Sequence, residues 1–200
     1  SSTGNTGGGY TPVDRMNRVL ASLGTWTISQ STDVPSGQGF ANSLKYDCTV
    51  ADASPSGNDQ LALDYRIEAQ DVFHLSSGTS NALKTTVSFW TKSNKTGTYT
   101  FEVQGNDANR NISKTYTIDS ADTWEFKSIT IDADTGGSGV ADDNGIGWIL
   151  KWWLDVGTNW NSGTLQTTWA TPVKANRVSS SQVSLGDSTD NEWYITGIQF

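Results

Sequence analysis

The chain has 200 residues, a formal net charge of −8 and a sequence pI near 4.4. A negative protein repels nucleic-acid phosphates and anionic lipid headgroups, so we expect neither as a partner. With Cys48 as the only cysteine, an intrachain disulfide is excluded, and no apolar run approaches the length of a membrane span.

The composition is typical of a β-rich globular domain. Nine Trp, six Tyr and six Phe supply large apolar area, while charged residues make up only 17%. Residues 1–9 form a Gly/Ser/Thr/Asn tract, which predicts a flexible linker, and residues 10–200 are expected to form one domain. The chain starts without a methionine, and we expect it to be part of a longer polypeptide, or the processed portion of one.

The pattern of apolar residues predicts one short helix followed by strands. Residues 14–23 carry Met16, Val19, Leu20 and Leu23 at helical spacing. Alternating apolar residues then predict strands at 25–29, 43–50, 60–70, 83–93, 98–104, 112–118, 124–131, 148–155 and 193–200. Cys48 shares the apolar face of its strand, so we expect a buried thiol. The whole predicts a two-sheet antiparallel jelly-roll β-sandwich.

The most informative strand is 148–155, which holds three tryptophans. Trp148, Leu150, Trp152 and Leu154 share one face, which must point into a core. Trp153 lies on the other face, between Lys151 and Asp155. Two interpretations remain for that face: a solvent-facing platform that stacks against a sugar ring, or a strand covered on both sides.

Three more tryptophans complete the candidate carbohydrate-binding set. Trp160 and Trp169 lie in the long polar stretch 157–184, outside any strand pattern. Such a stretch forms either a functional loop or a wrap around the sandwich, and its indoles are also suited to a subunit contact. Trp90 lies on the face of its strand opposite Val87 and Phe89.

Clustered carboxylates indicate a candidate calcium site. Asp132, Asp134, Asp142 and Asp143, with Asn144, surround a Gly-rich loop, and Ca²⁺ prefers several oxygen ligands from flexible turns. The alternative is a set of Asp/Gly turns that form without metal, since the spacing lacks the EF-hand pattern. No His/Cys cluster supports a transition metal, and no cofactor is required.

Catalysis finds little support in the sequence. His74 is the only histidine, next to a predicted turn, so a nucleophile–base arrangement would depend on it alone. Acidic pairs such as Glu68 and Asp71 are expected by chance among 21 carboxylates. We therefore expect a protein that is not an enzyme; the enzymatic alternative is a glycan depolymerase or lyase.

Ordered segments along the chain resemble the jelly-roll domains of tail-fibre and other virion surface proteins from tailed bacteriophages, a family abundant in marine and cyanobacterial phages. The matching segments are 9–16, 32–40, 67–71, 87–93, 96–99, 113–118, 122–125, 142–147 and 194–200. They cover the chain from about residue 9 onward. The Asn-Gly-Asp-Met-type stretch that usually precedes them in the family is missing here.

The resemblance implies a non-enzymatic virion component with a carbohydrate-binding-like fold. It implies a location on the virion surface, a homo-oligomer (most often a trimer) in contact with other virion proteins, and contact with a host surface glycan or receptor. The alternative is a purely structural decoration or connector protein, whose aromatic residues are buried at subunit contacts and bind no sugar.

Overall fold

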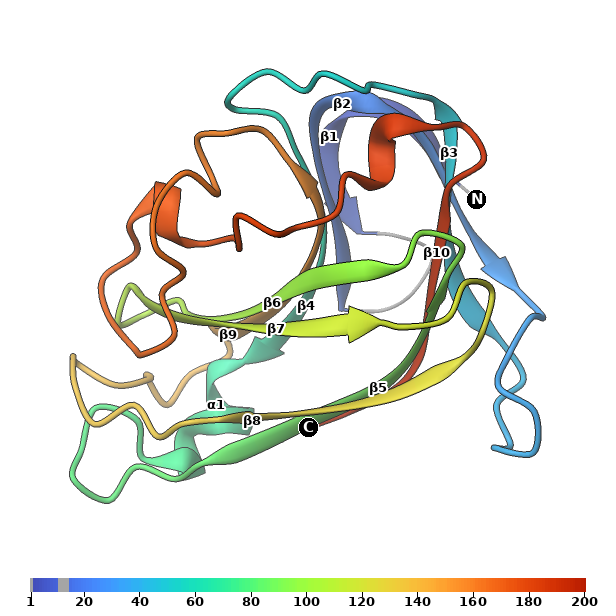
Figure 1. Cartoon of the computed structure of the whole chain (residues 1–200). Helices are drawn as coiled ribbons and strands as arrows, with labels where there is room; N and C mark the ends of the chain where they lie inside the picture. The colour runs from blue at the N-terminus through green and yellow to red at the C-terminus, as the bar shows by residue number, and fades with distance from the viewer. Residues whose placement is uncertain (1, 11–14) are drawn as a thin grey trace.

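A computed structural model describes residues 2–10 and 15–200 (Figure 1). The strands are β1 (Ser2–Tyr10), β2 (Met16–Ser31), β3 (Ser43–Val50), β4 (Gln60–Glu68), β5 (Thr85–Ser93), β6 (Gly97–Gly105), β7 (Arg110–Ile118), β8 (Glu125–Ile131), β9 (Ile146–Val156) and β10 (Glu192–Gln199). The helices are α1 (Ala69–Val72) and the 3-10 helices η1 (Phe73–Leu75), η2 (Lys174–Asn176) and η3 (Leu185–Asp187). All these strands pair antiparallel, which confirms the predicted all-β class. Within the described residues, no helix is long and apolar enough to cross a bilayer.

Strand β2 joins two layers of one continuous sheet. Its first half, Met16–Ala21, pairs with β4, and its second half, Thr25–Ser31, pairs with β3. The first layer is therefore β7-β6-β9-β4 and the second is β3-β10-β5-β8, with β1 alongside β2 (Figure 1). Ser22 and Gly24 have φ values of 53° and 66°, and these left-handed residues lie at the bend between the two halves.

Replacing Gly24 by alanine is expected to lower the free energy of unfolding by about 2–3 kcal/mol. The added Cβ would clash with the backbone oxygen of Val50, and φ is positive. Gly37→Ala is the matched control, because its φ is 74° and nothing lies within 4 Å of the added Cβ. The control isolates backbone strain of about 1 kcal/mol in urea unfolding. Equal losses for both variants would rule out the clash.

The predicted helix over residues 14–23 is wrong. Residues from Met16 onward form strand β2, and Asp14 lies outside the described residues. Met16, Arg18 and Leu20 pair with residues of β4 that face the core, while Asn17 and Val19 face outward under other chain segments. Because both faces of this strand are covered, its apolar residues do not alternate, and they imitate helical spacing.

The amino-terminal segment also differs from its prediction. The composition predicts a linker over residues 1–9, whereas Ser2–Tyr10 form β1, paired along β2. Residue 1 lies outside the described residues. Backbone hydrogen bonds build a strand pair whatever the side chains, so a tract of small polar residues can still add an edge strand.

The core lies between the layers and is rich in aromatic rings. Trp148, Leu150, Trp152 and Leu154 are buried there, as the alternation of β9 predicts. The ring of Trp152 packs edge-on against Phe89 of the second layer, with centroids 5.4 Å apart. Cys48 is buried as expected, and it is the one free cysteine of the chain.

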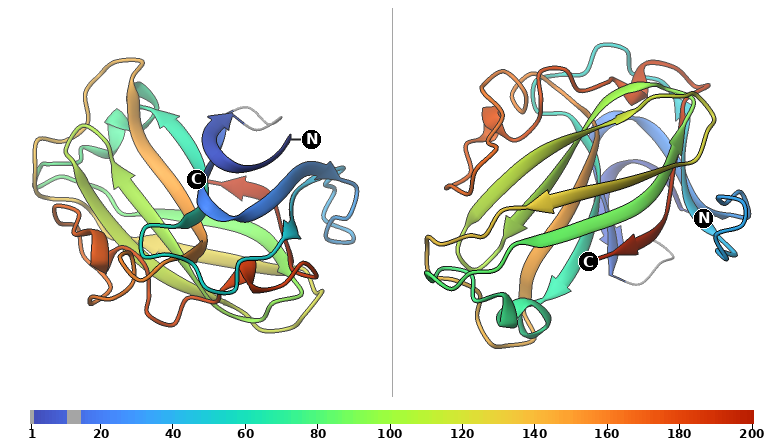
Figure 2. Two further views of the ribbon diagram at one scale, coloured as in Figure 1. Left: turned by 90° about the horizontal axis from the view of Figure 1, so that it is seen from above. Right: turned by 60° about the horizontal axis from the view of Figure 1, so that its bottom comes forward.

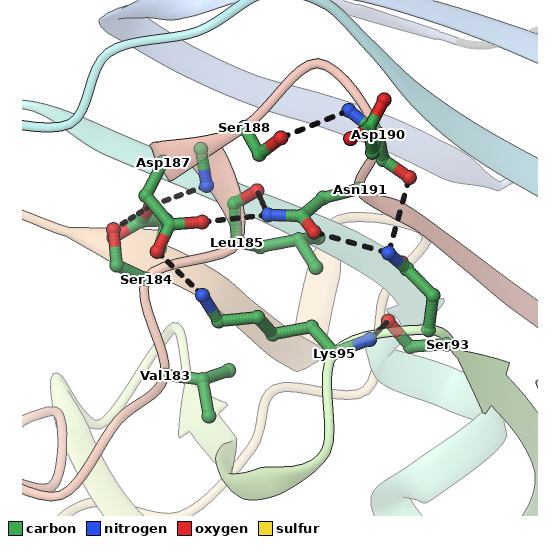
Figure 3. A network of polar contacts seen from close by, with 12 residues as sticks. Ser93, Lys95, Val183, Ser184, Leu185, Asp187, Ser188, Asp190 and Asn191 are labelled. Carbon is green, nitrogen blue, oxygen red and sulfur yellow. Dashed lines mark hydrogen bonds and ion pairs between the residues drawn. The ribbon is translucent and has the colours of Figure 1, made fainter. Parts of the chain in front are cut away.

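A polar network positions the start of β10 against the turn between β5 and β6 (Figure 3). The Asn191 side chain donates to Asp187 Oδ1 at 2.7 Å and to the backbone oxygen of Leu185 at 2.9 Å. Lys95 forms an ion pair with the same Asp187, and its backbone N–H donates to Ser93 Oγ. These contacts hold the start of β10 next to β5.

Candidate functional site

The outward face of β9 is covered, so the predicted solvent-facing platform at Trp153 is wrong. Trp153 is 0% exposed, and its indole donates to Glu102 Oε2 at 2.7 Å. The stretch 157–184 packs over it (Figure 1), and the ring of Trp160 lies 5.2 Å from the Trp153 ring. The second interpretation, a strand covered on both faces, is the correct one.

A buried ion pair attaches the covering stretch to the first layer. Arg177 donates to Glu102 Oε1 from Nε at 2.9 Å and from Nη2 at 2.7 Å. The Arg177 guanidinium also lies 5.5 Å from the Trp153 ring and 5.6 Å from the Trp160 ring. Gln166 of the stretch donates to Asn111 Oδ1 on β7, and the Thr100 backbone N–H on β6 donates to Gln182 Oε1. The stretch is thus part of the scaffold.

Trp160 and Trp169 are half-buried and attach loops to the body of the protein. The Trp160 indole donates to the backbone oxygen of Asn58, with the Lys174 ammonium 4.4 Å from its ring. The Trp169 indole donates to the backbone oxygen of Asp132 and packs against Trp148 at 5.5 Å. Neither side chain joins Trp90 in a common surface.

Trp90 belongs to a different surface, the outward face of the second layer. It packs against Phe126 of β8 with ring centroids 5.5 Å apart, and Phe126 is 53% exposed. Nearby on the same layer, Trp124 packs against Tyr194 of β10 at 6.0 Å. In the right-hand view of Figure 2, no segment crosses over β8, β5 and β10. We call Trp90, Trp124, Phe126 and Tyr194 the aromatic face, in which Tyr194 is only 5% exposed and lies beneath its neighbours.

Paired charges surround the aromatic face. Asp33 accepts hydrogen bonds from the Trp124 indole at 2.8 Å and from the Lys92 ammonium, which lies 4.4 Å from the Tyr194 ring. Partial burial disfavours the charge of Asp33, yet the bonds from Lys92 and Trp124 hold the pKa of this carboxyl below its usual range. Lys45 is paired with Glu192 at 2.5 Å. Each of these cations is therefore neutralised by a carboxylate.

Burial also perturbs the phenol of the aromatic face. It raises the pKa of Tyr194 to about 12, with Glu192 adding to the effect. Tyr194 therefore stays a neutral hydrogen-bonding group at physiological pH. The face presents aromatic rings next to ion-paired polar side chains, a combination suited to stacking on and hydrogen-bonding an uncharged, partly apolar ligand.

Sequence reasoning found Trp90 but missed Trp124, Phe126 and Tyr194. The alternation of β8 contained a signal, since Phe126, Ser128 and Thr130 are exposed while Ile129 and Ile131 are buried. What the sequence did not contain is the pairing that places Phe126 opposite Trp90. Without it, the aromatic residues could not be assigned to one surface.

Three of the four candidate calcium ligands are bonded to other partners. Asp132 pairs with Lys84 and Lys114, and their hydrogen bonds hold its pKa below the usual range. Asp134 is buried and accepts two bonds from Arg110 at 3.0 Å. Of the other two, Asp142 is exposed and Asp143 accepts a hydrogen bond from its own turn, at the N–H of Gly145. Across residues 2–10 and 15–200, no three carboxylate, imidazole or thiol groups lie together as a metal site.

Comparisons with known proteins give similarities of fold only. No protein-family model and no curated protein matches the sequence. Among solved structures, the enzymatically active domain of bacteriophage CBA120 tailspike protein 4 aligns with TM-score 0.46 and 12% identity, over 92% of this chain and 18% of that one. A family 11 carbohydrate-binding module from Clostridium thermocellum, in complex with a β-1,3-1,4-mixed-linked tetrasaccharide, aligns with TM-score 0.44 and 12% identity, over 93% and 88%. At 12% identity, neither the activity of the tailspike domain nor the ligand of the carbohydrate-binding module is transferred to this chain.

Proposed function

We propose that this domain is a non-enzymatic, glycan-binding β-sandwich of the virion surface of a tailed bacteriophage. The observation that supports glycan binding is the aromatic face, where Trp90 and the 53% exposed Phe126 pack side by side on an uncovered sheet. Sugar rings have apolar faces and hydroxyl edges, which match aromatic rings surrounded by polar groups. Nucleic acid remains an unexpected ligand, because the chain has a net charge of −8.

The virion role rests on the ordered sequence resemblance to phage tail-fibre and surface domains, and so does a marine or cyanobacterial phage origin. On this proposal the domain lies outside the host cell, contacts other virion proteins and assembles as a homo-oligomer, with a trimer as the expected state. It requires no cofactor. Its glycan ligand belongs to the surface of a bacterial host.

Binding is tested by affinity electrophoresis in gels that contain neutral polysaccharides, including mixed-linkage β-glucan, galactan and purified bacterial surface polysaccharide. Trp90→Ala and Phe126→Ala are each expected to weaken retardation about tenfold or more, because large aromatic contacts dominate such interfaces. Phe73→Ala is the matched control, since Phe73 is equally exposed but lies on η1, outside the aromatic face. Equal retardation of wild type and Trp90→Ala, or none with any polysaccharide, contradicts the proposal.

The same exposed rings favour a second candidate, a connector that binds only other copies of itself. A large exposed apolar side chain such as Phe126 is also suited to a subunit contact. Light scattering separates the two candidates. If Phe126→Ala dissociates an oligomer and no polysaccharide retards the wild type, the face is a subunit contact.

A further inference from the structure

A hollow of about 620 Å³ opens between the two layers, next to the aromatic face. Its floor consists of Leu44, Tyr65, Ile195 and Ile198, which come from β3, β4 and β10. The volume falls within the range of small-ligand sites in proteins, which combine apolar walls with a few placed polar groups. None of the candidate residues from the sequence lines it.

The polar side chains that line this hollow are neutral, and two of them have no partner within residues 2–10 and 15–200. No charged side chain lines it among the described residues. The side-chain amides of Gln30 and Asn42 stand at its rim, exposed, and neither forms a hydrogen bond within the described part of the chain. An amide offers both donors and acceptors, so these two groups match ligand hydroxyls.

An aromatic ring forms one wall of the hollow. Phe40 lies directly against Gly197, where an added Cβ would clash with the ring. Gly197 has a φ of 62°, so both its backbone and the position of the ring favour glycine here. Phe40 is partly buried and presents the remaining ring surface to the hollow.

The hollow and the aromatic face adjoin at β10. Thr196, which lines the hollow, pairs directly with Trp90 across β10 and β5. Its hydroxyl donates to the backbone oxygen of Asn42 at 2.9 Å, which fixes the loop that carries Phe40 and Asn42 to this strand. The loop that carries Phe40 and Asn42 is therefore held against the strand that pairs with the Trp90 strand.

We propose that this hollow is a subsite for a neutral sugar unit, a terminal residue or side branch of the glycan on the aromatic face. The inference rests on the proposed function and adds the ligand class. The unit stacks on Phe40 and bonds to the amides of Gln30 and Asn42. We expect uronic, phosphorylated and sulfated sugars to be excluded, because no cation among the described residues lines the hollow and the protein is negative.

The test uses NMR of the labelled full chain with millimolar cellobiose, lactose, methyl mannoside or N,N′-diacetylchitobiose, and glucuronic acid as the charged comparison. Gln30→Leu and Asn42→Leu assign the two side-chain amide signals. At least one neutral sugar is expected to shift both signals, whereas glucuronic acid shifts neither. Phe40→Ala is expected to weaken that sugar about tenfold, while Trp90→Ala changes its affinity less than about twofold.

The outcomes separate this inference from the proposed function. If neutral sugars shift neither amide signal, or if binding survives in Phe40→Ala, the subsite does not exist, even where polysaccharide retardation still depends on Trp90. If the amide signals shift but the retardation by polysaccharide does not depend on Trp90 or Phe126, the subsite exists and the proposed glycan-binding role of the aromatic face is wrong.

Discussion

Arg177→Ala is expected to lower the free energy of unfolding by about 3–5 kcal/mol, because it leaves a buried carboxylate without its cation. Glu102 is 0% exposed; the Arg177 guanidinium balances its charge, and the Trp153 indole donates a hydrogen bond to it. The substitution also removes the guanidinium that lies over both the Trp153 and the Trp160 ring. Urea unfolding, followed by tryptophan fluorescence, measures the loss.

Two further variants show whether the charge is the cause. Arg177→Met combined with Glu102→Gln removes both charges and is expected to recover a large part of the loss. Lys84→Ala is the surface control: its ion pair with Asp132 is largely exposed, so the change should stay below about 1 kcal/mol. If the double variant is less stable than Arg177→Ala, the ion-pair account is incorrect.

The free energy of unfolding is expected to rise by about 1 kcal/mol when pH falls from 7 to 5, because of Asp155. Asp155 is 2% exposed and accepts hydrogen bonds from the N–H groups of Val156 and Gly186 and from Ser184 Oγ. Burial outweighs these bonds and raises the pKa of Asp155 from 3.8 to about 6. The folded state thus binds this proton more tightly than the unfolded chain. Stability is lost as pH rises from about 4 through 6, by about 3 kcal/mol in total.

The pH effect is assigned by its slope. Urea unfolding at a series of pH values is expected to give a curve that falls between pH 5 and 7 in the wild type and is flat there in Asp155→Asn. Performing both in the His74→Gln background removes the one histidine of the chain. Below pH 4 the trend reverses, since Asp33 has a lowered pKa in the fold and loses its bonds when protonated. An unchanged slope in Asp155→Asn would assign the effect to another group.

The alternation within one strand predicts which side chains face the core. It does not predict whether the opposite face is covered, because a segment distant in sequence provides that cover. The alternation of β9 was enough to place Trp148 and Trp152 in the core. Whether Trp153 is exposed to solvent depends on the stretch that carries Arg177. This residue lies 24 positions beyond Trp153 and pairs with Glu102 on another strand. That cover follows from long-range pairing, which no local pattern contains.

The candidate sites follow the same logic. The aspartates near the Gly-rich loop satisfy the composition of a calcium site, yet Lys114 and Arg110 of β7 take two of them as partners. The aromatic face, in contrast, arises because antiparallel pairing brings Trp90 opposite Phe126 and Thr196. Residue types were readable from the sequence, while their neighbours across the sheet were not.

The central claim is that glycan binds the second layer at Trp90, not the first layer at Trp153. The most direct measurement is a titration of the labelled chain with a retarding polysaccharide fragment, observed at the assigned indole N–H signals. The signals of Trp90 and Trp124 are expected to shift, while those of the buried Trp152 and Trp153 stay in place. Shifts confined to Trp160 and Trp169, with Trp90 unchanged, would contradict the account and assign binding to the stretch 157–184.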